Sequence, residues 1–105
     1  MILRVWRAVA SPENAPAYRR HLETSVLPEL KKLPGFQGLK LCQRALQDDV
    51  EVLVMSQWRS MDAIKAFAGP KPEQAVVEPH ARAVLAEFDD FVSHYDITLE
   101  AAGTA

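Results

Sequence analysis

The sequence predicts one small α+β domain built in the order βαββαβ. Segments rich in β-branched and aromatic residues indicate strands at residues 2–9, 36–46 and 50–58 and from about Phe91 onward. Apolar residues at helical spacing lie between the first two strands and before the last one. The chain has 105 residues, enough for one domain and not for two. We therefore expect one domain over residues 1–105, with a core at about 2–99 and a tail at 100–105.

The first helix is expected directly after strand 2–9. Either Ser11 or Asn14 caps it, and each is followed by a proline that fits the first helical turn. The apolar side chains that then recur at helical spacing are Ala15, Tyr18, Leu22 and Val26. Pro28 should kink or restart the helix, because it has no backbone N–H and clashes with the preceding turn. Pro34-Gly35 ends the helix.

The second and third strands are expected to form an antiparallel hairpin. Gln47-Asp48-Asp49 between them is typical of a turn. The third strand has apolar residues on both faces: Val50, Val52, Val54 and Trp58 point one way, and Leu53 and Met55 point the other. The second strand repeats this pattern, with Phe36 and Cys42 opposite Leu39 and Leu41. We interpret Cys42 as a small buried hydrophobic residue.

The second helical region should be broken into pieces. Ser60 is a predicted N-cap for a short helix, and a Gly-Pro-Lys-Pro segment at residues 69–72 ends that helix. Pro79 then fits the start of a further helix. The apolar sides of the two pieces are Met61, Ile64 and Phe67, then Val84, Leu85 and Phe88.

The last strand shows a period of two. Its apolar set is Phe91, Tyr95, Ile97 and Leu99, and the alternating residues are mostly polar and include His94. We therefore expect Tyr95 on the buried face and His94 on the polar face. The complete order is the ferredoxin-like arrangement, an antiparallel sheet with helices on one face.

A second apolar sheet face predicts a homodimer. Helices of a single βαββαβ unit cover one face, and the other would leave a contiguous apolar patch in water, which soluble monomers rarely tolerate. A second copy related by a twofold axis is the simplest cover. The alternative is a monomer covered by its own tail at residues 101–105, but these residues are few and small.

Composition excludes several classes of function. The formal net charge of −2, with mixed signs along the chain, gives no reason to expect a nucleic-acid or membrane partner. No apolar run approaches the roughly 20 residues that span a bilayer, and no signal peptide begins the chain, so we expect a cytoplasmic protein. A single cysteine excludes an intramolecular disulfide. His21, His80 and His94 are not spaced as a metal motif, so no metal is expected.

Several segments resemble the antibiotic biosynthesis monooxygenase (ABM) superfamily. They are Leu33-Pro34-Gly35-Phe36, residues 54–63 with Trp58 before Ser60 and Ala63, residues 66–69 and 75–79, and the ending with Phe88-Asp89 and His94-Tyr95. The resemblance covers about residues 2–99. Within the superfamily, the sequence resembles a bacterial ABM-like subgroup. The resemblance implies a dimeric α/β barrel with a ligand cavity between the sheet and helices of each subunit.

The resemblance leaves three functions open. The first is a cofactor-independent monooxygenase that acts on an aromatic or quinol-like small molecule. The second is a non-catalytic ligand-binding or stress-associated dimer. The third is a haem-degrading monooxygenase with His80 as axial ligand. This chain has Phe67 near the position of a tryptophan of the haem-degrading relatives, no asparagine in the first strand, and Val54 where phenol-oxidising members carry asparagine.

A phenol-oxidising site needs a base and groups that hold an anion. His80 is the candidate acid–base residue. The expected ligand-binding residues are Trp58, Phe67, Tyr18, Arg7 and Tyr95; Arg44 and His94 are also available. The alternative interpretation is structural: Trp58 and Tyr18 as core residues, His80 as an exposed residue at a helix start, and His94 as an exposed or dimer-contact residue.

Overall fold

Five strands pair in one antiparallel sheet in this computed structural model, which describes residues 1–104. The hairpin of β2 (Phe36–Leu46) and β3 (Asp49–Trp58) pairs through β3 with β1 (Ile2–Ala10). On its other side, β1 pairs with the short strands β4 (Glu87–Phe88) and β5 (Ser93–Asp96). The predicted βαββαβ order is confirmed, with the last strand divided into two pieces.

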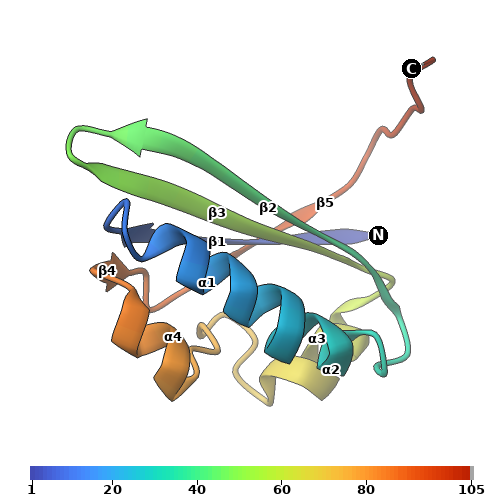
Figure 1. The fold of residues 1–105 in the computed structure, drawn as a ribbon. Coiled ribbons are helices and arrows are strands. Elements are labelled where there is room, and N and C mark those ends of the chain that lie inside the picture. Colours follow the sequence, from blue (N-terminus) through green and yellow to red (C-terminus); the bar gives the residue numbers. More distant parts are fainter. Residues whose placement is uncertain (105) are drawn as a thin grey trace.

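The helices all lie on one face of this sheet (Figure 1). They are α1 (Ala15–His21), the π-helical turn η1 (Leu22–Val26), α2 (Leu27–Leu30), α3 (Met61–Ala68) and α4 (Pro79–Val84). The first three follow one another without a gap between β1 and β2. No helix of residues 1–104 is long and apolar enough to cross a membrane.

The N-cap of α1 is Asn14, one of the two predicted positions. Its side chain makes no capping hydrogen bond; Ser11 Oγ instead accepts a hydrogen bond from the Asn14 backbone N–H in the preceding turn. Pro28 lies in the first turn of α2, so the helix restarts there as predicted. The sequence did not predict η1, whose wider turn directly follows His21.

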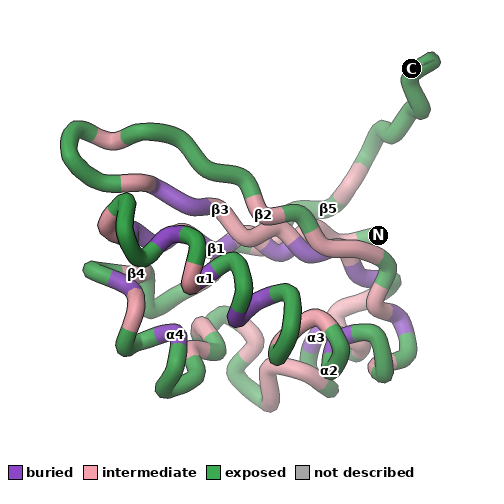
Figure 2. Tube along the Cα trace, in the orientation of Figure 1, coloured by how far each residue is buried: buried purple, intermediate pink, exposed green. Residues whose placement is uncertain are grey.

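Opposed residues of an antiparallel pair share a face, so the register shows which side chains meet the helices. Trp6 is opposite Val54, and Ala8 is opposite Val52; these residues face the helical layer. Figure 2 shows buried segments along β1 and the inner sides of the helices, whereas the far end of the β2–β3 hairpin is exposed. The two predicted faces of β3 are confirmed.

The prediction for β2 was wrong in two respects. Phe36 lies on the helical face, in edge-to-face contact with Trp58, and not on the face of Cys42. The reason is an irregularity between Phe36 and Gly38, which inverts the alternation on one side of it. Cys42 is exposed and not buried, because it lies opposite Leu53 on the sheet face that no helix covers.

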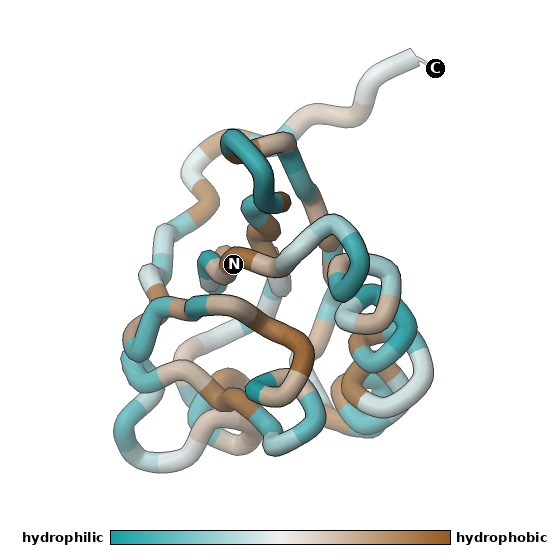
Figure 3. Tube along the Cα trace, turned by 60° about the vertical axis from the view of Figure 1, so that its left-hand side comes forward, coloured by the Kyte–Doolittle hydropathy of each residue, from teal (hydrophilic) through white to brown (hydrophobic). Residues whose placement is uncertain are grey.

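The end of the chain also differs from its prediction. The last helix ends at Val84, and Phe88 belongs to β4. Tyr95 pairs with Leu3 on the uncovered face and is 57% exposed, whereas His94 pairs with Arg4 on the helical face. The predicted orientation of this strand was therefore inverted. Ala101–Thr104 are exposed and leave the body of the molecule, so they do not cover the second face (Figures 1 and 3).

The close contact between the start of β2 and the start of α3 explains why the chain carries a Pro-Gly-Phe segment there. Gly35 has a φ of +88°, and a Cβ built there would lie 2.6 Å from Ala63 Cβ. Its carbonyl accepts a hydrogen bond from the Arg59 N–H, and Ser60 caps α3 as predicted, by accepting from the Ala63 N–H. Glycine is thus required by both backbone conformation and close packing.

Candidate functional site

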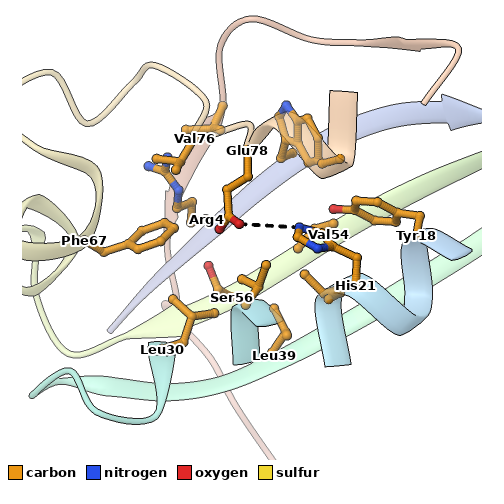
Figure 4. Close-up of a pocket in the computed structure, with 15 residues that line it drawn as sticks. Arg4, Tyr18, His21, Leu30, Leu39, Val54, Ser56, Phe67, Val76 and Glu78 are labelled. Atoms are coloured by element: carbon orange, nitrogen blue, oxygen red, sulfur yellow. Dashed lines mark ion pairs between the residues drawn. The ribbon is translucent and has the colours of Figure 1, made fainter. Parts of the chain in front are cut away.

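An internal cavity lies between the helical face of the sheet and the helices. It offers about 70 Å³ to water-sized molecules, room for about five to seven waters at roughly 10–15 Å³ each. Its lining comes from both layers: Arg4 and Phe67 lie at one side, His21 and Tyr18 at the other, and Glu78 and Ser56 between them (Figure 4). The lining residues are Arg4, Trp6, Tyr18, His21, Leu22, Val26, Leu30, Leu39, Val54, Ser56, Phe67, Val76, Glu78, Ala81 and Val92.

His21 is the most unusual residue of the cavity wall. It is only 6% exposed, and its Nε2 is a buried atom with no hydrogen-bond partner among residues 1–104. The nearest charged group is Glu78, whose Oε2 lies 3.7 Å from Nε2, too far for a hydrogen bond but close enough for an ion pair if the ring is protonated. Buried polar atoms are nearly always paired, so this nitrogen calls for an explanation.

His80, the acid–base residue expected from the sequence, lies outside the cavity. It is exposed at the start of α4, and its ring packs against that of His21 with centroids 4.8 Å apart. The two histidines and Glu78 also border a shallow outer hollow beside α1. His21 therefore separates the cavity from this hollow, and His80 contacts only its outer side.

Arg4 supplies a positive charge at the other side of the cavity. It is 5% exposed and lies in contact with the Phe67 ring, with Cζ 5.7 Å from the ring centroid. The guanidinium donates to the carbonyls of Pro72 (2.5 Å) and Gln74 (3.0 Å). Burial lowers the pKa of Arg4 to about 10, so the group remains charged at neutral pH.

His94 also contacts Arg4, at 2.9 Å between Nε2 and NH1. A guanidinium can only donate, so His94 Nε2 accepts, and the ring is neutral with its proton on Nδ1. Burial and the nearby Arg4 charge both lower the pKa of His94, in agreement with this state. His94 is half-buried and turned toward Arg4, so it does not have the exposed location considered for it.

Trp58 lies behind the cavity wall. It is fully buried, its Nε1 donates to Ser56 Oγ at 2.8 Å, and its ring stacks on Phe67 with centroids 5.7 Å apart. Ser56 and Phe67 are the residues that reach the cavity. The expected pair of Trp58 and Phe67 is thus brought together, with Trp58 supporting Phe67 from outside the cavity.

Tyr18 lines the cavity beside His21, as expected from its place on the apolar side of α1. Its ring centroid lies 6.5 Å from that of His21 and 6.3 Å from that of Trp6. Burial, and secondarily the charge of Glu78, raises the pKa of Tyr18. The phenol therefore stays protonated and can donate a hydrogen bond to a ligand.

Arg7 and Tyr95 are not part of the cavity, because both lie on the uncovered face of the sheet. Arg7 Nε and Arg44 Nε each donate to the Glu51 carboxylate at 2.6 Å. These hydrogen bonds, Arg44 first, hold the pKa of Glu51 below its ordinary value. The three residues form a charge cluster on that face, separate from the cavity.

Sequence reasoning missed His21, Glu78 and Arg4. His21 follows Tyr18 by three residues and precedes Leu22, so the helical periodicity of α1 contained a signal for its inward orientation. Arg4 shares the parity of Trp6 in β1, but both faces of that strand carry apolar residues. Glu78 had no comparable signal, since it lies in an irregular segment before α4.

Comparisons with known proteins agree on this architecture. Residues 1–79 match the family described as "Antibiotic biosynthesis monooxygenase". Similar solved structures include Rv0793 from Mycobacterium tuberculosis, with 19% identity, a TM-score of 0.63 and coverage of 96% of this chain and 98% of that one. A sequence comparison with curated proteins found no match.

Two further structures resemble the chain. The haem degrader MhuD from Mycobacterium tuberculosis, with two haems bound in its active site, has 18% identity, a TM-score of 0.64 and coverage of 97% and 100%. The monooxygenase ActVA-Orf6 of Streptomyces coelicolor, in complex with Nanaomycin D, has 17% identity, a TM-score of 0.63 and coverage of 99% and 91%. At these identities the likeness concerns the fold alone.

Proposed function

The chain belongs to the antibiotic biosynthesis monooxygenase family, and from this premise we propose that it is a cofactor-independent monooxygenase acting on an aromatic or quinol-like small molecule in the internal cavity. The observation that carries the proposal is His21 Nε2, a buried nitrogen in the cavity wall without a hydrogen-bond partner among residues 1–104. A phenolic hydroxyl of a ligand would supply the missing donor.

The reaction begins with proton removal. His21 Nε2 accepts the phenolic proton, and the Glu78 carboxylate at 3.7 Å stabilises the imidazolium that results. The electron-rich phenolate then donates electrons to dioxygen. One oxygen atom forms a new carbon–oxygen bond on the ring, and the other leaves as water with two hydrogens from the phenol. Phenol and dioxygen thus give quinone and water, and no external reductant is needed.

The apolar lining favours this chemistry. Leu39, Val54 and Leu30 line the space between His21 and Phe67 with apolar groups that disfavour water, which would protect a reactive anion and its partly oxidised form. Tyr18 can hydrogen-bond the ligand as a neutral donor. These residues position the ring, and His21 is the group that moves the proton.

The residues that line the cavity do not present the haem ligand that the family resemblance implies. His80, the expected axial ligand, lies outside the cavity. His21 Nε2 faces inward, but Glu78 lies 3.7 Å from it. No step through haem follows from these residues.

We also propose that the working unit is a homodimer joined through the uncovered sheet face. Leu3, Val5, Leu53 and Met55 form an apolar strip there, and the register places Tyr95 beside Leu3. These side chains are partly exposed in the single chain. A second copy of the same face would bury the strip, and a twofold arrangement presents the same strip from both partners.

The test of the function compares His21→Gln with His80→Gln. Each purified variant receives 1-naphthol in air-saturated buffer, and oxygen uptake and quinone absorbance are recorded together. We expect His21→Gln to lower the rate by about 100- to 10,000-fold, the usual contribution of a positioned base. His80→Gln should keep the rate within about threefold, because His80 does not reach the cavity.

Three results would change the proposal. Loss of the rate in His80→Gln, with the rate retained in His21→Gln, would return the base role to His80. Naphthol binding without oxygen uptake in the wild-type protein would reject catalysis and favour a ligand-binding dimer, which the mostly apolar lining also suits. A saturable Soret shift with haemin that disappears in either histidine variant would instead establish haem binding.

A further inference from the structure

Arg4 is a buried cation at the cavity with no carboxylate within ion-pairing distance among residues 1–104. We propose that Arg4 receives an anionic oxygen of the ligand, so that the substrate class is an aromatic acid with its hydroxyl at His21 and its carboxylate at Arg4. The hydroxyl end of this assignment rests on the proposed function, whereas the carboxylate end rests on Arg4 alone.

The guanidinium is held in place without being neutralised. Its partners are two backbone carbonyls, of Pro72 and Gln74, and the neutral ring of His94. These contacts occupy three of the five N–H groups of an arginine. A buried charge normally requires an opposite charge to offset the loss of hydration, and here the protein supplies only neutral acceptors. Nε and one hydrogen of Nη2 make no hydrogen bond among residues 1–104, and a planar carboxylate is the kind of acceptor that suits a pair of such donors.

The side chains around Arg4 hold its guanidinium in a fixed position, which favours specific binding of one ligand group. Phe67 packs on the guanidinium at 5.7 Å, and Phe67 is itself stacked on the buried Trp58. Arg4 also projects from the central strand of the sheet, which is paired on both sides. A site built on rigid elements keeps its geometry before the ligand arrives.

The two sides of the cavity carry opposite charges. Figure 4 shows Arg4 and Phe67 on one side, and His21 and Tyr18 on the other, with the Glu78 carboxylate turned toward His21. A ligand carboxylate is attracted to the Arg4 side and repelled by Glu78 at the His21 side. The same polarity leaves the phenolic hydroxyl at the base, so the charges select one orientation of an aromatic hydroxy acid.

A purely structural role makes a different prediction. If Arg4 only ties residues 72–74 to β1, replacing it would loosen the cavity wall and weaken every ligand alike. If it binds an anion, the loss should depend on the ligand's charge. Matched ligands therefore separate the two roles even when a variant is less stable.

The experiment measures equilibrium binding of 6-hydroxy-2-naphthoate and of its methyl ester, and of 4-hydroxybenzoate and its methyl ester, at pH 7 and low ionic strength. We expect the wild-type protein to bind the acid of at least one pair about 10- to 100-fold more tightly than its ester, the range of one charge-assisted contact. In Arg4→Met this ratio should fall to about one, with ester binding changed less than about threefold. Arg4→Lys should retain part of the ratio.

Arg59→Gln is the charge control. Arg59 is exposed and does not line the cavity, so this substitution removes the same unit of charge as Arg4→Met but away from the cavity. It should keep the wild-type ratio. A ratio near one in the wild-type protein overturns the proposal, and this measurement stands even if Arg4→Met fails to fold. Equal weakening of acid and ester in Arg4→Met overturns it as well.

Failure of the two proposals can be told apart. A high acid-to-ester ratio without oxygen uptake leaves an aromatic-acid binding site and rejects the oxygenase. Oxygen uptake with a ratio near one keeps the oxygenase and rejects the role of Arg4.

Discussion

Replacement of His21 by leucine should stabilise the protein while it abolishes the proposed activity. The buried Nε2 without a hydrogen bond carries a desolvation penalty of about 1–3 kcal/mol. Leucine would remove that penalty beside the apolar residues Leu22 and Val26. It would lose the ring contact with the exposed His80 and the weak attraction to Glu78, so we take a net gain of about 1–2 kcal/mol.

This gain in the free energy of unfolding corresponds to a measurable rise of the melting temperature Tm. An unfolding entropy of about 2.1 cal/mol/K per residue gives roughly 0.22 kcal/mol/K for a chain of 105 residues. The His21→Leu variant should therefore melt about 5–9 °C above the wild-type protein. The assay is thermal unfolding by circular dichroism at matched protein concentration, because oligomer formation makes Tm depend on concentration.

His80→Leu is the matched control, since it removes an exposed imidazole one ring away and should change stability by no more than about 0.5 kcal/mol. A lower Tm in His21→Leu would refute the reasoning, because it would mean that His21 is a satisfied core residue. Retained oxygen uptake in a stabilised His21→Leu variant would refute the assignment of the base.

Three other perturbations test the fold and its surface. Gly35→Ala should destabilise the protein by at least about 1–3 kcal/mol, since it combines a φ of +88° with a 2.6 Å approach to Ala63; adding Ala63→Gly should recover only the packing part, as measured by urea unfolding. The pKa of Glu51 is lower in the folded protein than in the unfolded chain, so its contribution is fully present above the unfolded value of about 4.3 and is lost as pH falls through the lower folded value. Glu51→Gln should therefore flatten the acid limb of stability against pH, and an unchanged limb would contradict this. Leu53→Asp on the uncovered face should convert the proposed dimer into a monomer in light scattering, whereas a charge reversal at the exposed Lys65 of α3, on the other side of the sheet, should not.

The sequence predicted most of the fold because its signals are local. The period-two pattern of β3, the Ser60 cap and the Pro28 restart depend on residues next to one another, and all three are confirmed. The irregularity after Phe36 and the π-helical turn after His21 depend on tertiary packing, which the pattern of one strand or helix does not contain.

The cavity was harder to predict for a related reason. Its polar residues come from β1, α1 and the segment before α4, and no short motif connects them. His80 and His21 are both histidines near helix ends, and only the packing of α4 against α1 shows which ring faces inward. Arg7 and Arg4 are equally basic, and the choice between them depends on which parity of β1 meets the helices.

The inverted orientation of the last strand bears on the proposed dimer. The alternation from Phe91 to Leu99 predicted one apolar face, and the expectation assumed that this face meets the helices. Tyr95 instead lies beside Leu3, on the face that no helix covers, and His94 turns inward because Arg4 offers it a hydrogen bond. A strand with its aromatic residue on an open face and its imidazole toward the interior makes physical sense if the open face is buried in the working molecule. If Leu53→Asp left the chain in its wild-type oligomeric state, this explanation of the alternation would fail, and the exposure of Tyr95 would need another cause.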